Sequence, residues 1–459
     1  MSTSWLANAD PATFWAHQTW PDFAALPQKE YAVVVLPIYG FADHGADRPL
    51  DQEETLGGAL LRRAIEHVKL RFTVRVLPPL RFALAAKATG LFGVDPETAH
   101  DLLQEIAESV RAADFHKLVF FNTSPVNEPL VATAAMDIRA ALGLSTYVIH
   151  ARALGLDPAR PTADDTAPMA EHLAQLLTEI RQHLAPPLLI KAESGRRKAE
   201  RMPFSAPFPA YRYYYLPALS RAQLTAIPAK DQALVVLPTA AIEQHGPHLP
   251  VGVDAILGQA LLGAAIPKVA GRAPVYIAPP ITYGKSNEHL GYPGTVTLSS
   301  RTLRRLVLAL ATQLRELGFR RLAIFNTHGG NSTVLAATVR ELREALDLDA
   351  TVLRHSFKPD VSAQEAAWGF HADEWETSLM LACAPELVRM KQAVCEYPAR
   401  LGDPGELRPG NAPATFAWMT RDISKSGVMG DATKATAAKG RRWLDAAATA
   451  LAERIAGSA

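Results

Sequence analysis

The stretch from Ile242 to Asp254, IEQHGPHLPVGVD, gathers several side chains that can bind a metal ion. Glu243, His245 and Asp254 lie on a turn rich in Pro and Gly, directly after an apolar run at 233–238 that is typical of a buried strand. Glu243 and His245 are two positions apart, so in extended backbone their side chains can point the same way. Imidazole and carboxylate ligands suit Zn²⁺, Mn²⁺ or Fe²⁺ better than a soft, thiol-seeking ion.

Two later segments add further ligands of the same kind. His328 ends another apolar run, in NTHGGN, where two glycines let the backbone come close to a ligand. The segment HADEWETSLML then supplies His371, Glu374 and Glu376 before an apolar helix. With three or more carboxylates available, one could bridge two ions. Two-metal sites activate a water molecule and polarise a scissile carbonyl.

Each motif alone also has an ordinary structural interpretation. A His beside Gly is common in turns, and ETS before an apolar run is typical of a helix start. His248 stands between Pro247 and Pro250, which favours a role in orienting the loop. His289, in NEHLGYPGT, either touches substrate or caps a turn, and we favour the substrate. The agreement of four separate segments favours a shared metal centre.

The chain also contains a second, altered copy of these motifs. Residues 36–61 align without a gap on residues 237–262, with ten of 26 positions identical, and residues 117–144 align on residues 321–348 with ten of 28. Two matches in the same order at offsets of 201 and 204 indicate two related domains.

The first copy has lost ligands. Ala42 stands where the second copy has Glu243, and Ser124 stands where it has His328. The first copy also stops early, with no counterpart of the segment around His371. We therefore interpret the first copy as a degenerate, truncated scaffold.

In each copy β-branched runs alternate with helical stretches, which predicts an α/β fold with a mostly parallel sheet. Ligands in such sheets bind beyond the carboxyl ends of the strands, where the motif loops fall. The predicted boundaries are a pseudo-domain at 1–186, a Pro-rich charged linker at 187–210 and a catalytic domain at 211–459.

Composition excludes several other classes of protein. The chain has 459 residues, is 48% hydrophobic and 20% charged, and carries a net charge of +1, so no basic excess argues for nucleic acid. Neither a signal peptide nor an apolar run of membrane-spanning length is evident. Two cysteines make no disulfide framework. We expect a cytoplasmic protein with neither a nucleic-acid nor a membrane partner.

Taken together, the motifs from about Tyr211 to Ile455 resemble the creatininase (creatinine amidohydrolase) family. They are LPTAAIEQHGPHLPVGVD, GYPGTVTLS, FNTHGGN, HADEWETSLML and GVMGDATKATAAKG. The resemblance implies a three-layer α/β/α sandwich, here present twice, that binds two divalent metal ions and commonly forms hexamers. It implies these metal ligands, with Asp254 bridging: Glu243, His245, Asp254, His328 and Glu376.

The resemblance also implies roles for neighbouring residues. His371 and Glu374 would be the catalytic groups that transfer protons beside the ions. The substrate-binding residues would be His289, Gly294, Thr295, Gly329 and Gly330. Creatininases carry a second acidic ligand where this chain has Gly330, and Asp373 stands where the family usually has Gly. The HGGN form is similar to the branch that contains formamide deformylases and peptide-trimming enzymes.

We therefore expect a metal-dependent amidohydrolase that cleaves the C–N amide bond of a small molecule, a cyclic amide or a formamide. The alternatives are a peptide-trimming metallohydrolase and a non-catalytic, metal-binding regulatory homologue. The internal duplication further predicts a homo-oligomer, in which three chains would form a trimer of pseudo-dimers.

Overall fold

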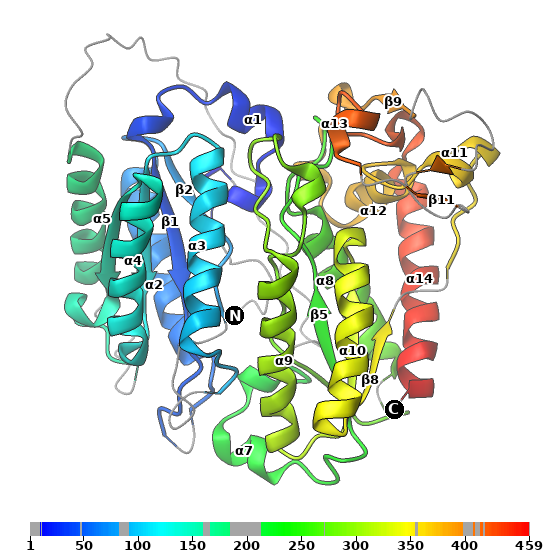
Figure 1. Cartoon of the computed structure of the whole chain (residues 1–459), viewed down its shortest axis with the longest axis horizontal. Coiled ribbons are helices and arrows are strands. Elements are labelled where there is room, and N and C mark those ends of the chain that lie inside the picture. The colour runs from blue at the N-terminus through cyan, green and yellow to red at the C-terminus, as the bar shows by residue number, and fades with distance from the viewer. Residues whose placement is uncertain are drawn as a thin grey trace.

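The computed structural model consists of two α/β halves, each built on its own four-stranded sheet (Figure 1). It describes residues 10, 12–45, 48–81, 91–158, 166–183, 213–269, 271–353, 357–397, 407–408, 414–415 and 418–458. The predicted linker at 187–210 lies outside these residues, so the predicted domain boundaries stay predictions.

The first half has strand order β2-β1-β3-β4, and all neighbouring strands are parallel. Every residue of β1 and β3 is buried, as expected for a parallel sheet covered on both faces. The strands are β1 (Val33–Ile38), β2 (Val74–Val76), β3 (Lys117–Asn122) and β4 (Ser145–His150). The helices are α1 (Trp20–Ala25), α2 (Gln52–Val68), α3 (Pro96–Ala112), α4 (Glu128–Leu142) and α5 (Thr166–Gln182).

The second half repeats this plan, with order β6-β5-β7-β8 and again only parallel pairs. Its strands are β5 (Leu234–Thr239), β6 (Val275–Ile277), β7 (Arg321–Asn326) and β8 (Asp349–Leu353). Its main helices are α7 (Arg221–Ala226), α8 (Val253–Val269), α9 (Ser300–Glu316), α10 (Ser332–Leu346) and α14 (Ala437–Ser458). The predicted fold, an α/β sandwich present twice, is confirmed.

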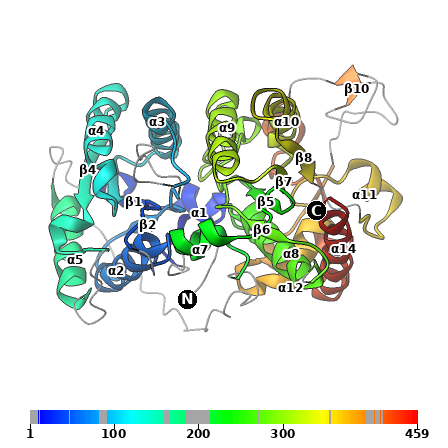
Figure 2. The same ribbon diagram turned by 90° about the horizontal axis from the view of Figure 1, so that it is seen from below.

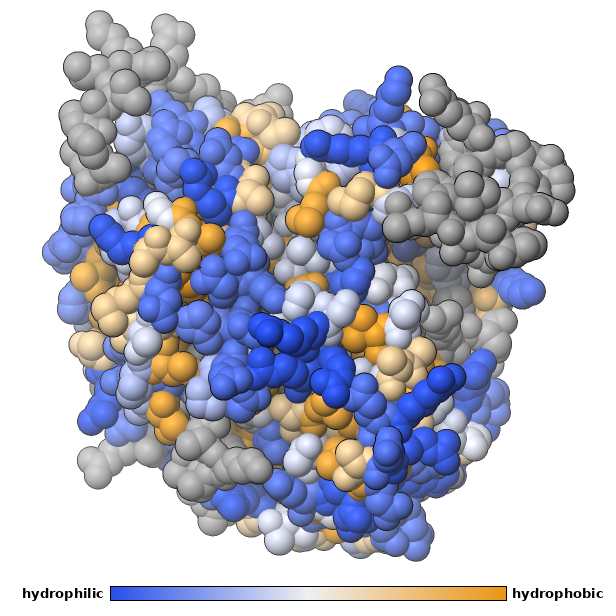
Figure 3. Space-filling view, in the orientation of Figure 1, coloured by the Kyte–Doolittle hydropathy of each residue, from blue (hydrophilic) through white to orange (hydrophobic). Residues whose placement is uncertain are grey.

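Helices cover both faces of each sheet. Seen from below, α3, α4, α9 and α10 lie on one face, and α2, α5, α8 and α14 lie on the other (Figure 2). On the face shown in Figure 3 the apolar described residues form small separate areas within a polar surface. Among the described residues, none of the helices combines the length and apolarity that a membrane span requires.

The first half is shorter because it lacks one segment. After β4 it proceeds through a short 3-10 helix to α5, which packs on α2 as α14 packs on α8. In the second half a long insertion separates β8 from α14. Its elements are α11 (Ala363–Trp368), α12 (Glu374–Cys383), β9 (Cys395–Glu396), β10 (Leu407–Arg408), β11 (Ala414–Thr415), α13 (Thr420–Ile423) and β12 (Gly430–Asp431).

The two halves contact each other reciprocally. Each half extends a short segment across to the loop that precedes the first long helix of the other half. The backbone hydrogen bonds are Val251 N to Gln18 O (2.8 Å), Gly252 N to Ala16 O (2.9 Å), Leu50 N to Leu219 O (3.1 Å) and Asp51 N to Pro217 O (2.8 Å). The second pair of bonds repeats the first at the offset of 201 found in the sequence. Such self-complementary contacts are those of a twofold-symmetric dimer, formed here within one chain.

Candidate metal centre

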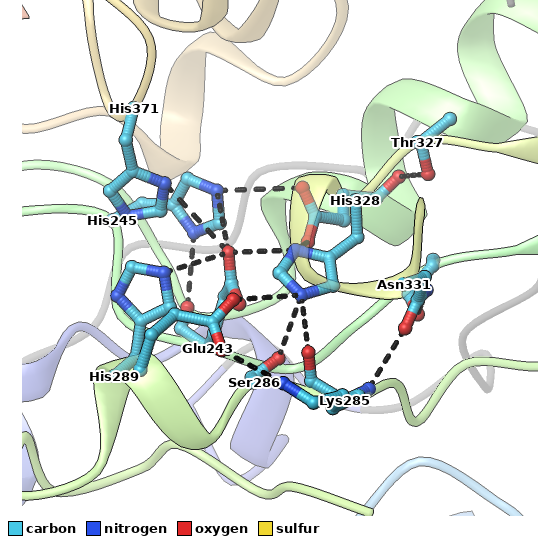
Figure 4. A network of polar contacts seen from close by, with 12 residues as sticks. Glu243, His245, Lys285, Ser286, His289, Thr327, His328, Asn331 and His371 are labelled. Atoms are coloured by element: carbon cyan, nitrogen blue, oxygen red, sulfur yellow. Dashed lines mark hydrogen bonds and ion pairs between the residues drawn. The ribbon is translucent and has the colours of Figure 1, made fainter. Parts of the chain in front are cut away.

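The predicted ligands lie at the carboxyl ends of the strands of the second half. Glu243 and His245 follow β5, and His328 follows β7 directly. Asp254 lies in the first turn of α8, and Glu376 lies in the first turn of α12, inside the insertion. All five side chains turn toward one point from four separate segments. The convergence predicted from the sequence is therefore present, and Figure 4 shows Glu243, His245 and His328 facing one another.

The ligand atoms form two groups that share one carboxylate. Glu243, Asp254 and His328 make one group, and His245, Asp254 and Glu376 make the other, each with its ligand atoms within 4.8 Å of one another. His328 Nδ1 lies 3.1 Å from Glu243 Oε1 and 3.3 Å from Asp254 Oδ2. His245 Nε2 lies 3.5 Å from Asp254 Oδ1 and 3.7 Å from Glu376 Oε2. Asp254 thus faces both groups, one with each oxygen.

Three imidazoles are held by backbone carbonyls on the side away from the carboxylates. A ring N–H that donates to a carbonyl leaves the other nitrogen free to bind a metal, an arrangement common around metal ions. These contacts are His245 Nδ1 to Glu243 O (3.0 Å), His328 Nε2 to Lys285 O (2.8 Å) and His371 Nε2 to Gln244 O (2.8 Å).

Burial and mutual attraction set the protonation of this cluster. Burial raises the pKa of Glu243 and raises that of Glu376 to about 7, although His245 opposes both shifts. Burial alone would lower the pKa of His245, but Glu376 and Asp254 raise it to about 9. The pKa of His328 is raised in the same way. Burial alone would raise the pKa of Asp254, but the imidazoles of His245 and His328 lower it. In the absence of metal ions, protons therefore supply positive charge to the buried carboxylates.

The residues fit a pair of divalent cations. Three ligand atoms, Glu243 Oε2, His245 Nε2 and Asp254 Oδ2, are buried and make no hydrogen bond among the described residues. Buried polar atoms without partners are rare and costly. A cation between them would satisfy all three, and nitrogen and oxygen donors of this kind match Zn²⁺, Mn²⁺ or Fe²⁺.

His371 and His289 complete the wall of the cluster. The His371 ring lies 4.3 Å from the rings of both His245 and His289, centroid to centroid. His289 Nε2 lies 3.5 Å from Glu243 Oε1, and His371 Nδ1 lies 3.8 Å from the same oxygen. Burial holds the pKa of both His289 and His371 well below the ordinary value, and the neighbouring imidazoles add to the effect. Both rings are therefore neutral near pH 7.

Glu374 is placed differently from the prediction. Its Oε1 pairs with Lys439 on α14, and its backbone N donates to Glu365 Oε1 (2.9 Å). Glu374 and Glu376 are two residues apart on a helix, so their side chains point about 200° apart. The Glu376 side chain is the one that points toward the other ligands. The structure does not bring the Glu374 carboxylate to the centre.

Gly294 and Thr295 support the centre from behind. A Cβ at Gly294 would lie 2.3 Å from the Phe23 ring, and the Gly294 carbonyl accepts a hydrogen bond from Trp15 Nε1 (2.9 Å). Both aromatic residues belong to the first half of the chain. Thr295 Oγ1 accepts from Gln244 N (3.1 Å), which fixes the backbone between the two ligands after β5. Neither residue is in a metal-ligand group; their predicted contact with substrate stays a prediction.

The two glycines after His328 differ from each other. A Cβ at Gly329 would meet nothing within 4 Å, whereas one at Gly330 would lie 2.5 Å from His328 Nε2. Only Gly330 is required by close packing. The prediction that backbone crowds the site at these glycines therefore holds for Gly330 alone.

Two residues at the centre were not assigned to it from the sequence. Gln244 is fully buried, and its Nε2 lies 2.9 Å from His289 Nδ1. Its position between two ligands in the motif was the available signal. Glu288, the residue before His289, belongs with Glu243 and His289 to a further group of potential ligands.

In the first half, the carboxylate at the corresponding position is paired with protein groups. Glu53, the counterpart of Asp254, accepts from Gly40 N (2.8 Å) and Thr123 Oγ1 (3.2 Å) and lies 3.0 Å from His44 Nε2. Among the described residues of this half, no three potential ligands come together. The loss of the first metal site stays a prediction.

Comparison with known proteins identifies the family. The family model described as creatinine amidohydrolase (creatininase) matches residues 16–212 and again residues 217–455. The chain belongs to the creatininase family. The two matches also agree with the duplication seen in the sequence and in the two sheets.

Relatives within the creatininase family are hydrolases of different kinds. The chain is 34% identical to a mycofactocin precursor peptide peptidase of Mycolicibacterium smegmatis, over 48% of this chain and 84% of that protein. It is 31% identical to a creatinine amidohydrolase of Pseudomonas putida, over 50% of this chain and 90% of that protein. A solved structure described as the Mn form of creatininase is 26% identical, with a TM-score of 0.44, and covers 53% of this chain and 97% of its own. The protein is thus a hydrolase of this family.

Proposed function

We propose that the protein hydrolyses a C–N amide bond of a small molecule, a cyclic amide or a formamide, at a centre of two divalent metal ions. Zn²⁺, Mn²⁺ and Fe²⁺ all suit the ligands. The observation that carries the proposal is Asp254, whose two oxygens face different potential ligands, His245 on one side and His328 on the other. When bound, such a pair of ions lowers the pKa of a water molecule and polarises a carbonyl.

The side chains around the ions supply position and proton transfer. Carbonyls fix the rings of His245 and His328 before any substrate arrives. His371 and His289 are neutral and lie within 4 Å of Glu243, so either ring can accept a proton at the reacting water and pass it to the departing nitrogen. We favour His371, because its Nε2 contact with a carbonyl leaves Nδ1 as the proton acceptor.

An aromatic wall supports an approach path for the substrate. The Trp418 ring lies 6.5 Å from that of His289 and 5.9 Å from that of Phe370. Phe370 is 44% exposed, so this wall extends from the buried cluster to solvent. A small planar amide could slide along it to the ions.

The test is hydrolysis of a panel of substrates by the metal-loaded protein. Creatinine, other cyclic amides and formamides are each incubated with it, and the released amine or acid is measured. His245→Ala should abolish turnover and lower metal content, whereas His44→Ala, its counterpart in the first half, should change neither. If His245→Ala kept full turnover and stoichiometric metal, the assignment would be wrong. If no substrate were turned over by protein that binds two ions, the non-catalytic alternative would replace hydrolysis.

A second candidate is trimming of a peptide. Two relatives at 34% and 35% identity are peptidases that act on the mycofactocin precursor peptide. Peptides with free and blocked C-termini therefore belong in the same panel, with cleavage followed by mass spectrometry. Cleavage of peptides without turnover of small amides would decide for this candidate.

We also propose that the chain forms a trimer of pseudo-dimers. The reciprocal contacts between the halves support one chain as the equivalent of a dimer. Sedimentation at several concentrations should give a particle of three times 49.6 kDa. A monomer at all concentrations would contradict the proposal.

A further inference from the structure

The place of a side chain at position 330 is taken by a different carboxylate. A Cβ on Gly330 would lie 2.2 Å from Glu288 Oε1, 2.3 Å from Lys285 O and 2.5 Å from His328 Nε2. None of these separations is possible between real atoms. Position 330 must therefore be Gly as long as Glu288 and Lys285 keep their positions, and the carboxylate next to this position is that of Glu288 from the 285–289 loop.

Glu288 lies close to the buried ligands. It precedes His289 on a short 3-10 helix (Asn287–His289), and its Oε1 lies 3.7 Å from His328 Nε2. Its carboxylate, a Glu243 oxygen and a His289 nitrogen all lie within 4.8 Å of one another. Glu243 is 1% exposed, and its Oε2 accepts no hydrogen bond among the described residues. The Glu288 carboxylate thus belongs to the same group of potential ligands as Glu243, which has one buried oxygen without a hydrogen bond among the described residues.

Besides His328, Lys285 is the cationic side chain paired with Glu288 among the described residues. Its Nζ lies 3.8 Å from Glu288 Oε2, near the outer limit for an ion pair, and the two side chains are 26% and 15% exposed. Partly exposed pairs at such distances contribute little. A divalent ion next to Glu243 would interact with the Glu288 carboxylate more strongly than this lysine does.

We propose that Glu288 is a further ligand of the metal centre and binds the ion that Glu243 also binds. The inference rests on the proposed metal-dependent function and adds to it Glu288, a ligand that the sequence analysis did not assign to the metal centre.

The experiment measures metal binding and needs no substrate. Ion-free protein is titrated with Mn²⁺, and free Mn²⁺ is counted by electron paramagnetic resonance. Wild type should bind two ions. Glu288→Gln, which keeps the shape and removes the charge, should weaken one of them by roughly 10–100-fold and leave the other unchanged. Glu344→Gln, on the exposed side of α10, serves as the matched control and should bind both ions as wild type does.

Lys285→Met separates the proposal from a purely structural role of Glu288. If Glu288 is a ligand, removing the competing lysine should leave Mn²⁺ affinity unchanged or increased. If Glu288→Gln binds both ions normally while wild type binds two, the proposal is overturned and the metal-dependent function stands. If wild type binds no ion, both fail. Thermal unfolding of the ion-free proteins confirms that each variant is folded, so a loss of affinity in a folded Glu288→Gln supports the proposal.

Discussion

Removing the metal ions should destabilise the second half of the molecule and spare the first. Glu243 Oε2, His245 Nε2 and Asp254 Oδ2 are buried without hydrogen bonds among the described residues. Each unsatisfied buried atom costs about 1–3 kcal/mol. At about 1 kcal/mol per atom, ions that satisfy all three atoms stabilise the fold by about 3 kcal/mol. This is close to the roughly 4 kcal/mol of stabilisation expected from one ligand at a thousand times its Kd.

The assay is differential scanning calorimetry with and without a chelator. For a domain of this size about 1 kcal/mol shifts Tm by roughly 2–4 °C, so chelation should lower Tm by about 6–12 °C. Asp254→Asn removes the shared ligand, so its Tm should respond to the chelator much less than wild type does. Glu53→Gln is the control: it breaks hydrogen bonds in the first half, so it should lower stability equally with and without metal.

Two results would refute this reasoning. One is a chelator that removes the ions, as metal analysis shows, yet leaves the Tm of wild type unchanged. The other is an equal response to the chelator in wild type and Asp254→Asn. Either would mean that the buried carboxylates are satisfied in some other way.

Three further predictions concern the same centre. Gly330→Ala should weaken metal binding by roughly 10–100-fold, because its Cβ displaces the carbonyl that orients a ligand imidazole. Gly329→Ala, whose Cβ meets nothing, should bind metal normally, and titration calorimetry measures both affinities. Metal affinity should rise with pH, since the ions must displace protons from His245 (pKa about 9) and, below about pH 7, also from Glu376; affinities that stay constant from pH 6 to 9 would contradict this. Trp15→Phe replaces a buried indole by a smaller phenyl ring and loses one buried hydrogen bond to the second half, so the free energy of unfolding in urea should fall by at least about 1 kcal/mol.

The fold and most of the metal centre could be predicted because they depend on local patterns. Buried parallel strands are continuous apolar runs, and their carboxyl ends necessarily meet at one edge of the sheet. Glu243, His245 and His328 follow directly from that rule. Because these three residues follow closely after the ends of their strands, the backbone can place their side chains in few other positions.

Other features depend on details that a sequence does not fix. Glu374 and Glu376 exchange roles if a helix begins two residues earlier or later, and helix starts are uncertain by about that much. Glu288 reaches the centre only because Gly330 leaves room for it. The bond from Trp15 to Gly294 joins residues 279 positions apart, so no local pattern announces it.

The first half has lost ligand residues but has kept its backbone contacts with the second half. The backbone bonds between the halves keep their twofold correspondence, although the ligands matching Glu243 and His328 are gone. The contacts are also unequal in a way that favours the second half. Trp15 and Phe23 press on the loop around Gly294, whereas the positions that match them at the offset of 201 are both leucines. Larger aromatic side chains, one of them hydrogen-bonded, are thus found beside the half that carries the candidate metal centre, and leucines are found at the matching positions beside the other half. This difference indicates that the first half holds the loop around Gly294 in place.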